Sequence, residues 1–113
     1  ALINNSVLGM VRQWQTLFYG ERYSNTTLNP QDGEQIPNFE MLAQAYGMAA
    51  RTVRNAEDIE EAIEWAMSIN DRPVLLDFRV SKDAMVWPMV AAGVPNDDIR
   101  YARDIAPDWE VED

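Results

Sequence analysis

The sequence predicts an α/β fold in which three parallel strands are flanked by helices. Two features of the chain support this fold. Short apolar runs of strand length alternate with longer segments in which apolar residues recur every three or four positions. The run at residues 74–80 is almost continuously apolar, as expected for a parallel strand covered on both faces. A parallel sheet of only three strands is thin, so we also expect that strands belonging upstream are missing from this sequence.

The chain begins with an expected strand and an expected helix. Residues 1–3 are a short apolar run before Asn4-Asn5, which is typical of the end of a buried strand. Residues 8–20 place apolar side chains on one face of a helix, and Gly20 is suited to end it. That apolar face comprises Met10, Val11, Trp14, Leu17 and Phe18.

A long loop and a second helix are expected next. Residues 21–37 are polar and rich in turn formers, and loops of this length are usually functional or mobile. Asn38 is a favoured N-cap, because its side-chain oxygen can accept a hydrogen bond from an unpaired backbone N–H, and Gly47 is placed to end the helix. Residues 48–53 give a weaker strand pattern.

The third helix has the clearest helical pattern. Asn55 is expected to cap it, and Glu57 and Asp58 lie in its first turn, where the helix dipole favours negative charge. The acidic residues further along the helix fit a solvated face better than a binding site. The buried stripe is expected to comprise Ile59, Ala62, Ile63, Ala66 and Met67.

The composition excludes several kinds of function within this chain. There is no histidine and no cysteine, so Ser-His and Cys-His catalysis, disulfides and metal sites built from these residues are excluded. Nineteen acidic residues against nine basic ones give a formal charge of -10, which repels nucleic acids and anionic membranes. We therefore expect no nucleic-acid and no membrane partner. Because the sequence opens within a strand pattern, at Ala1-Leu2-Ile3, we expect it to be a fragment.

The segment after the first strand is the candidate for chemistry. Ligands of open α/β sheets bind outside the carboxyl ends of the strands, and free N–H groups at a helix start favour phosphate. The side-chain oxygens of Asn4 and Asn5 and the nearby backbone carbonyls are hard ligands that suit Mg²⁺. Spacing alone allows a Mg²⁺-diphosphate site here or an ordinary turn followed by a helix cap, and it favours the ordinary turn.

A resemblance to a known family changes this balance. Enzymes that use thiamine diphosphate carry a motif that starts at Gly-Asp-Gly and ends at Asn-Asn, and this chain resembles its end at Asn4-Asn5 without its start. Nearly the whole chain resembles the large catalytic subunit of acetohydroxyacid synthase, also called acetolactate synthase, and most closely its actinobacterial members. The matching segments are residues 8–15, 17–19, 22–24, 73–77, 87–93 and 96–97.

The resemblance implies roles for individual residues. Asn5 would ligate Mg²⁺ through its side-chain oxygen, and Val7 would do so through its backbone carbonyl. Trp14, with Met10, would line the pocket for the second 2-ketoacid and favour 2-ketobutyrate over pyruvate, whereas Phe18 would stay in the core. The residues that would line the cofactor are Asn5, Ser6, Val7, Leu8, Gly9 and Met10.

The resemblance also divides the chain into two parts. Residues 1–83 would be the C-terminal part of the diphosphate-binding domain, and residues 84–113 a C-terminal tail near the active-site channel, which Ala92 would line. The sequence favours a short helix from Pro95 to Ala102 in that tail. In the family the long loop tends to order over the active site, and in this chain we expect disorder or an altered path.

The family would make this chain part of an enzyme. The full protein would condense two 2-ketoacids with release of CO₂ in branched-chain amino-acid biosynthesis, in the bacterial cytoplasm, with thiamine diphosphate, Mg²⁺ and FAD. Its partners would be further catalytic subunits, in a homodimer or higher oligomer, and a small regulatory subunit. The aspartate of Gly-Asp-Gly, the glutamate that activates the cofactor and the FAD-binding domain are absent, so we expect the isolated chain to be inactive.

Two other interpretations stay open. Another thiamine-diphosphate decarboxylase or a pyruvate oxidase would share Asn4-Asn5 and Gly9, although Gln13-Trp14 and Trp87-Pro88-Met89 argue against it. A stand-alone acidic binding module without catalysis would explain why half of the motif is missing.

Overall fold

The computed structural model describes residues 1–28 and 36–99, and in this part the fold is α/β as predicted. The strands β1 (Leu2–Asn4), β2 (Ala49–Val53) and β3 (Val74–Arg79) form one parallel sheet in the order β1-β3-β2. The most apolar run of the sequence is therefore the central strand, which pairs on both sides. The prediction of a buried first strand is wrong for this chain, because β1 lies at the sheet edge and Ile3 is 67% exposed there.

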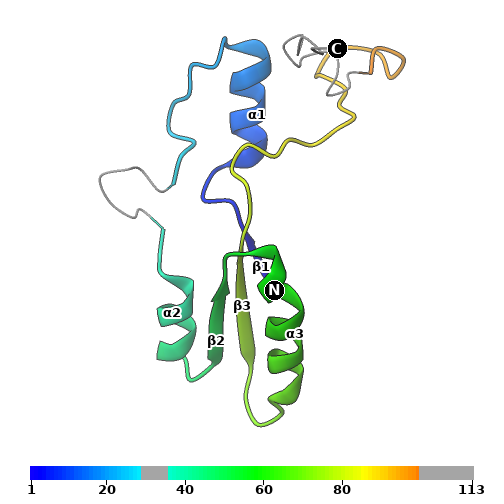
Figure 1. Ribbon diagram of the computed structural model, residues 1–113. Coiled ribbons are helices and arrows are strands. Elements are labelled where there is room, and N and C mark those ends of the chain that lie inside the picture. Colours follow the sequence, from blue (N-terminus) through cyan, green and yellow to red (C-terminus); the bar gives the residue numbers. More distant parts are fainter. Residues whose placement is uncertain (29–35, 100–113) are drawn as a thin grey trace, which may run out of the picture.

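Two helices cover the sheet and a third projects from it. Helices α2 (Phe39–Ala45) and α3 (Ile59–Ser68) lie on opposite faces, whereas α1 (Gly9–Phe18) extends beyond the carboxyl ends of the strands (Figure 1). Because side chains alternate along a strand, Thr52 and its register partner Asp77 face α2, and the next residues of both strands face α3. None of the helices in the described part of the chain is long and apolar enough to cross a membrane.

The apolar core lies between α3 and the sheet. Ala62 is 1% exposed, and its small side chain lets the helix approach the strands closely. The predicted buried stripe is only partly confirmed, because Ile59, Ile63 and Met67 are 40%, 46% and 75% exposed, and Trp65 packs on the sheet in their place. The core consists of Val53, Ala62 and Leu76, with Trp65, Ala66 and Phe78 packed against them.

The predicted ends of the first two helices are confirmed. The Asn38 side chain accepts a hydrogen bond of 3.0 Å from a backbone N–H in the first turn of α2. Gly20 and Gly47 follow α1 and α2 with φ angles of +59° and +76°, the left-handed conformation that ends many helices.

Two expectations further along the chain are wrong. Asn55 does not cap α3, because a short 3₁₀ turn, η1 (Ala56–Asp58), precedes that helix and the Asn55 amide donates to the Asp58 carboxylate instead. The helix expected from Pro95 is, in the described part, a turn in which the Asp98 N–H donates to the Pro95 carbonyl at 3.0 Å. Its expected end at Ala102 lies outside the described residues.

Candidate functional site

Residues 4–9, the β1–α1 corner, lie where the chain leaves the carboxyl end of the sheet. The Asn4 side-chain oxygen accepts hydrogen bonds from the Ser6 N–H at 3.1 Å and from the Ser6 hydroxyl at 3.4 Å. The Asn5 side-chain oxygen accepts from the Val7 N–H at 3.1 Å. These two successive asparagine turns bend the chain sharply, and Ser6 takes a φ of +58°. Both asparagines that the sequence singles out therefore shape the corner.

Gly9, the first residue of α1, packs against one of these asparagines. A Cβ atom at Gly9 would lie 2.9 Å from Nδ2 of Asn5, which is closer than non-bonded atoms normally approach. The missing side chain is therefore what lets the Asn5 amide lie against the start of the helix. The family resemblance implies that Gly9 lines the cofactor, but the sequence contains no sign of this contact.

Residues 26–28 run antiparallel beside the corner, with an isolated bridge between Val7 and Thr27. Two backbone hydrogen bonds of 2.8 and 2.9 Å flank that bridge. Val7 is buried, and its carbonyl accepts no hydrogen bond from any residue that the structure describes. Residues 21–28 of the long loop are thus described with a defined path beside the corner, whereas residues 29–35 lie outside the described part, so the expectation of disorder or an altered path stays a prediction.

The corner offers two hard oxygen atoms to a cation, one on the Asn5 side chain and one on the Val7 backbone. The Asn5 oxygen already accepts one hydrogen bond, but an amide oxygen has a second lone pair. Within residues 1–28 and 36–99 there is no group of three or more acidic, histidine or cysteine side chains placed to hold a metal. The corner therefore fits Mg²⁺ as a partial ligand set, which phosphate oxygens and further ligands must complete.

Helix α1 borders a hollow of about 480 Å³. Met10 and Trp14, the predicted substrate residues, both line it, so the structure brings them together. Met10 is 50% exposed, so this wall of the hollow is apolar and open. The lining residues are Met10, Val11, Trp14, Gln15, Tyr19 and Arg22.

A second hollow joins α1 to the C-terminal segment, residues 84–99. Ala92, the residue expected at the access channel, lines it together with Trp14 and Phe18. The two aromatic rings pack edge to face, with centroids 5.4 Å apart and planes at 68°. Phe18 is 39% exposed, so the expectation that it belongs to the core is wrong.

Gln13 holds the C-terminal segment against α1, a role that the sequence analysis does not predict. It is 2% exposed, its Nε2 donates to the Val86 carbonyl at 2.9 Å, and its Oε1 accepts from the Val86 N–H at 2.8 Å. Nε2 also lies 3.3 Å from the Met89 sulfur. The helical spacing does indicate this role. Gln13 falls on the apolar face of α1 between Met10 and Leu17, and a polar side chain buried there needs hydrogen-bond partners.

Arg12 joins three segments beside this contact. Its guanidinium lies 2.9 Å from the Asp83 carboxylate and 3.9 Å from the centre of the Tyr23 ring. Asp83 is 61% exposed, so the ion pair contributes only about 0–1 kcal/mol by itself. Its contribution is mainly to fix where the loop and the C-terminal segment meet α1.

A parallel sheet whose first strand ends in an asparagine corner at a helix start agrees with a cofactor-binding domain of the thiamine-diphosphate enzymes, the class that comparison with known families identifies. Residues 1–78 match the family described as thiamine pyrophosphate enzyme, C-terminal TPP binding domain. The chain belongs to this family, in which thiamine pyrophosphate is the same compound as thiamine diphosphate.

Similar proteins within this class are named acetolactate synthases. The acetolactate synthase large subunit of Corynebacterium glutamicum is 57% identical over 107 residues, which are 95% of this chain and 17% of that protein. The acetolactate synthase of Mycobacterium leprae is 53% identical over 112 residues, which are 99% of this chain and 18% of that protein. The acetolactate synthase large subunit of Porphyra purpurea is 46% identical over 95 residues, 84% of this chain and 15% of that protein.

The chain thus spans less than a fifth of the length of the curated relatives that it matches. The resemblance to the large subunit of acetolactate synthase, with actinobacterial members among the similar proteins, is confirmed.

Proposed function

We propose that this chain forms part of a thiamine-diphosphate-dependent acetolactate synthase, which condenses two 2-ketoacids with release of CO₂ in branched-chain amino-acid biosynthesis. The observation that carries the proposal is the β1–α1 corner, where the Asn5 side-chain oxygen and a Val7 carbonyl that no described residue hydrogen-bonds lie at a helix start. Identity of 57% to an acetolactate synthase large subunit supports the choice of reaction.

The corner holds the metal-diphosphate end of the cofactor in this proposal. Asn5 ligates Mg²⁺ through its side-chain oxygen and Val7 through its carbonyl, and diphosphate oxygens provide further ligands. The free N–H groups at the start of α1 favour the diphosphate charge. Bound thiamine diphosphate supplies a nucleophilic carbon and an electron sink for decarboxylation. FAD is proposed to bind outside this chain, and the residues proposed to line thiamine diphosphate are Asn5, Ser6, Val7, Leu8, Gly9 and Met10.

Trp14 and Met10 are proposed to line the pocket for the second 2-ketoacid. They share one hollow on α1. Contact with an aromatic surface there makes binding of 2-ketobutyrate more favourable than binding of pyruvate by about 1–3 kcal/mol, because of its extra methylene. Residues 1–83 would be the C-terminal part of the diphosphate-binding domain, and residues 84–113 the tail at the channel. The bonds between Gln13 and Val86 and the hollow that Ala92 shares with Trp14 support this division.

The partners and the location are proposals of the same kind. We propose a homodimer or higher oligomer of catalytic subunits, a small regulatory subunit and the cytoplasm of a bacterium. The name large subunit, carried by the Corynebacterium relative, supports a second type of subunit. The net charge of -10 supports the expectation that neither nucleic acid nor an anionic membrane is a partner.

Product analysis with the complete gene product tests the proposed function. With pyruvate, thiamine diphosphate and Mg²⁺ it is expected to form acetolactate and CO₂. When 2-ketobutyrate is added, most of the product is expected to come from condensation of pyruvate with 2-ketobutyrate. Acetaldehyde or acetate as the product would favour the decarboxylase or oxidase alternative. Absence of both turnover and cofactor binding would favour the binding module.

The 113-residue chain by itself is expected to be inactive. The corner supplies only part of the octahedral shell that Mg²⁺ requires, and the aspartate of the motif is absent from this sequence. Acetolactate formation by the purified chain would contradict this expectation.

A further inference from the structure

Asp77 on β3 is the only charged side chain that is fully buried in the described part of the chain, at 1% exposure. A buried carboxylate is strongly disfavoured unless it is paired. Its partner is Arg79, two residues along the same strand, whose Nε lies 3.2 Å from Oδ2 of Asp77. Neither the Nε atom of Arg79 nor the two carboxylate oxygens of Asp77 form a well-oriented hydrogen bond with a described residue, so the pair is held mainly by charge.

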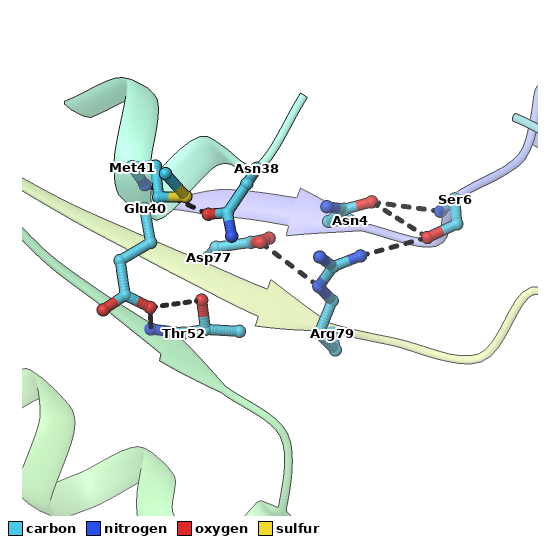
Figure 2. A network of polar contacts seen from close by, with 8 residues as sticks. All are labelled: Asn4, Ser6, Asn38, Glu40, Met41, Thr52, Asp77 and Arg79. Atoms are coloured by element: carbon cyan, nitrogen blue, oxygen red, sulfur yellow. Dashed lines mark hydrogen bonds and ion pairs between the residues drawn. The ribbon is translucent and has the colours of Figure 1, made fainter. Parts of the chain in front are cut away.

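Strand pairing places this ion pair beside the β1–α1 corner. In the parallel pairing of β1 with β3, Leu2 stands opposite Asp77 and Asn4 stands opposite Arg79. Residues two apart on a strand face the same side, so Asn4, Asp77 and Arg79 share the face of the sheet that α2 covers (Figure 2).

Arg79 connects the buried charge to the corner. Its Nη1 donates to the Ser6 hydroxyl at 3.2 Å, and the same hydroxyl donates to the Asn4 side-chain oxygen at 3.4 Å (Figure 2). Ser6, with its φ of +58°, is thus held by Asn4 from its own strand end and by Arg79 from the neighbouring strand. Ser6 lies directly between Asn5 and Val7, so its peptide orientation sets the directions of both oxygens proposed to ligate Mg²⁺.

Attachment of α2 does not explain the ion pair. The helix has its own polar contact with the sheet, in which the Glu40 carboxylate accepts from the Thr52 N–H at 3.1 Å and from the Thr52 hydroxyl at 2.8 Å (Figure 2). A buried ion pair is in general weak support for stability, because desolvation offsets most of the attraction. The contact that distinguishes this pair is the one from Arg79 to Ser6.

We propose that Asp77 and Arg79 are positioning residues for the cofactor site. Asp77 fixes the guanidinium of Arg79, Arg79 fixes the Ser6 hydroxyl, and Ser6 thereby holds the Asn5 side chain and the Val7 carbonyl in place for the Mg²⁺-diphosphate end of the cofactor. The inference rests on the proposed function. Groups that hydrogen-bond to the surroundings of metal ligands commonly change metal affinity about 10–100-fold when they are removed.

Calorimetric titration of the cofactor-free complete gene product with thiamine diphosphate, at fixed Mg²⁺, tests this inference. Ser6→Ala and Arg79→Gln are each expected to raise the Kd about tenfold. The double variant is expected to bind no more weakly than the weaker single variant, because both changes remove the same contact. The KM for pyruvate at saturating cofactor is expected to stay at the wild-type value, since the substrate pocket is untouched.

Two further variants complete the design. Ser68→Ala removes an exposed hydroxyl on α3 and is expected to keep the wild-type Kd. If Arg79→Gln does not fold because Asp77 is left unpaired, Asp77→Asn combined with Arg79→Gln removes both charges and takes its place.

The outcomes separate this inference from the proposed function. A wild-type Kd for the Arg79 variant would overturn the inference alone. A Kd of the double variant about a hundredfold above wild type would also overturn it, because the two changes would then act independently. A wild-type protein that binds no thiamine diphosphate would overturn the proposed function and the inference together.

Discussion

The side-chain amide of Gln13 forms two hydrogen bonds with the backbone of Val86, which lies 73 positions further along the chain. Both groups of the amide are used, one as donor and one as acceptor, and the side chain is 2% exposed. The contact fixes where the C-terminal segment crosses α1. It thereby sets the position of Ala92 relative to Trp14 in the hollow that they share.

Gln13→Leu is expected to destabilise this contact. The substitution leaves the N–H and the carbonyl of Val86 without partners, which costs about 1–3 kcal/mol for each group that stays buried. We expect the free energy of unfolding of the 113-residue chain to fall by about 2 kcal/mol in urea denaturation followed by tryptophan fluorescence. The C-terminal segment should also become more sensitive to protease.

Gln44→Leu is the matched control for this change. Gln44 is exposed on α2, and its side chain makes no hydrogen bond with the described residues, so the effect should stay within about 0.5 kcal/mol. Equal unfolding energies for the two leucine variants would show that the bonds to Val86 do not stabilise the chain.

Gly9→Ala is expected to separate stability from cofactor binding. Alanine is favoured over glycine in a helix by about 1 kcal/mol, so the substitution should not destabilise α1. The new Cβ would lie 2.9 Å from Nδ2 of Asn5, however, so the Asn5 side chain must move. We expect an unchanged or raised unfolding midpoint together with about tenfold weaker Mg²⁺-dependent binding of thiamine diphosphate.

Gly47→Ala should show the opposite pattern. Its Cβ would meet no atom within 4 Å, but the φ of +76° disfavours alanine by about 1 kcal/mol. A lower unfolding midpoint with unchanged cofactor affinity is therefore expected. If Gly9→Ala also kept full affinity, the contact between Gly9 and Asn5 would have no role in the site.

The sequence predicts the fold well where one pattern determines the structure. The central strand β3 is recognisable because a strand paired on both sides and covered on both faces must be apolar along most of its length. Asn38 and Gly47 are recognisable because a helix end leaves backbone groups that few residue types satisfy.

The buried faces of α1 and α3 are predicted less well. Apolar spacing shows which residues share a face of a helix. It does not show which of them become buried when the helix packs on a narrow sheet or against a segment that crosses it. In α3, Ala62 and Trp65 pack on strands β2 and β3, and Met67 stays exposed. In α1 the fully buried residue is the polar Gln13, because its partner is a backbone group far along the chain.

The residues of the candidate site also differ in how far the sequence predicts them. Asn5, Val7 and Trp14 are proposed from a local motif and from resemblance, and the Val7 carbonyl accepts no hydrogen bond from the residues that the structure describes, which agrees with the proposed ligand role. The link from Asp77 and Arg79 to Ser6 depends on the register of two strands distant in sequence, which no local pattern contains.

Trp14→Phe is expected to reduce the preference of the complete gene product for 2-ketobutyrate over pyruvate. The smaller ring contacts the extra methylene less, and a loss of about 1 kcal/mol corresponds to about fivefold in the ratio of products. Competition between the two ketoacids, with both products measured, provides the test. Trp65→Phe, on α3 and remote from the hollow, should keep the wild-type ratio, and an unchanged ratio in Trp14→Phe would remove Trp14 from the pocket.

The central claim is that Asn5 and Val7 bind the Mg²⁺ that holds thiamine diphosphate, and the Mg²⁺ dependence of cofactor binding by Asn5→Ala tests it most directly. Asn70→Ala, in an exposed turn at the far end of the sheet, is the matched control. We expect the Mg²⁺ concentration for half-maximal binding to rise more than about tenfold in Asn5→Ala and to stay unchanged in Asn70→Ala. A wild-type Mg²⁺ dependence in Asn5→Ala would contradict the assignment of the β1–α1 corner as the cofactor site.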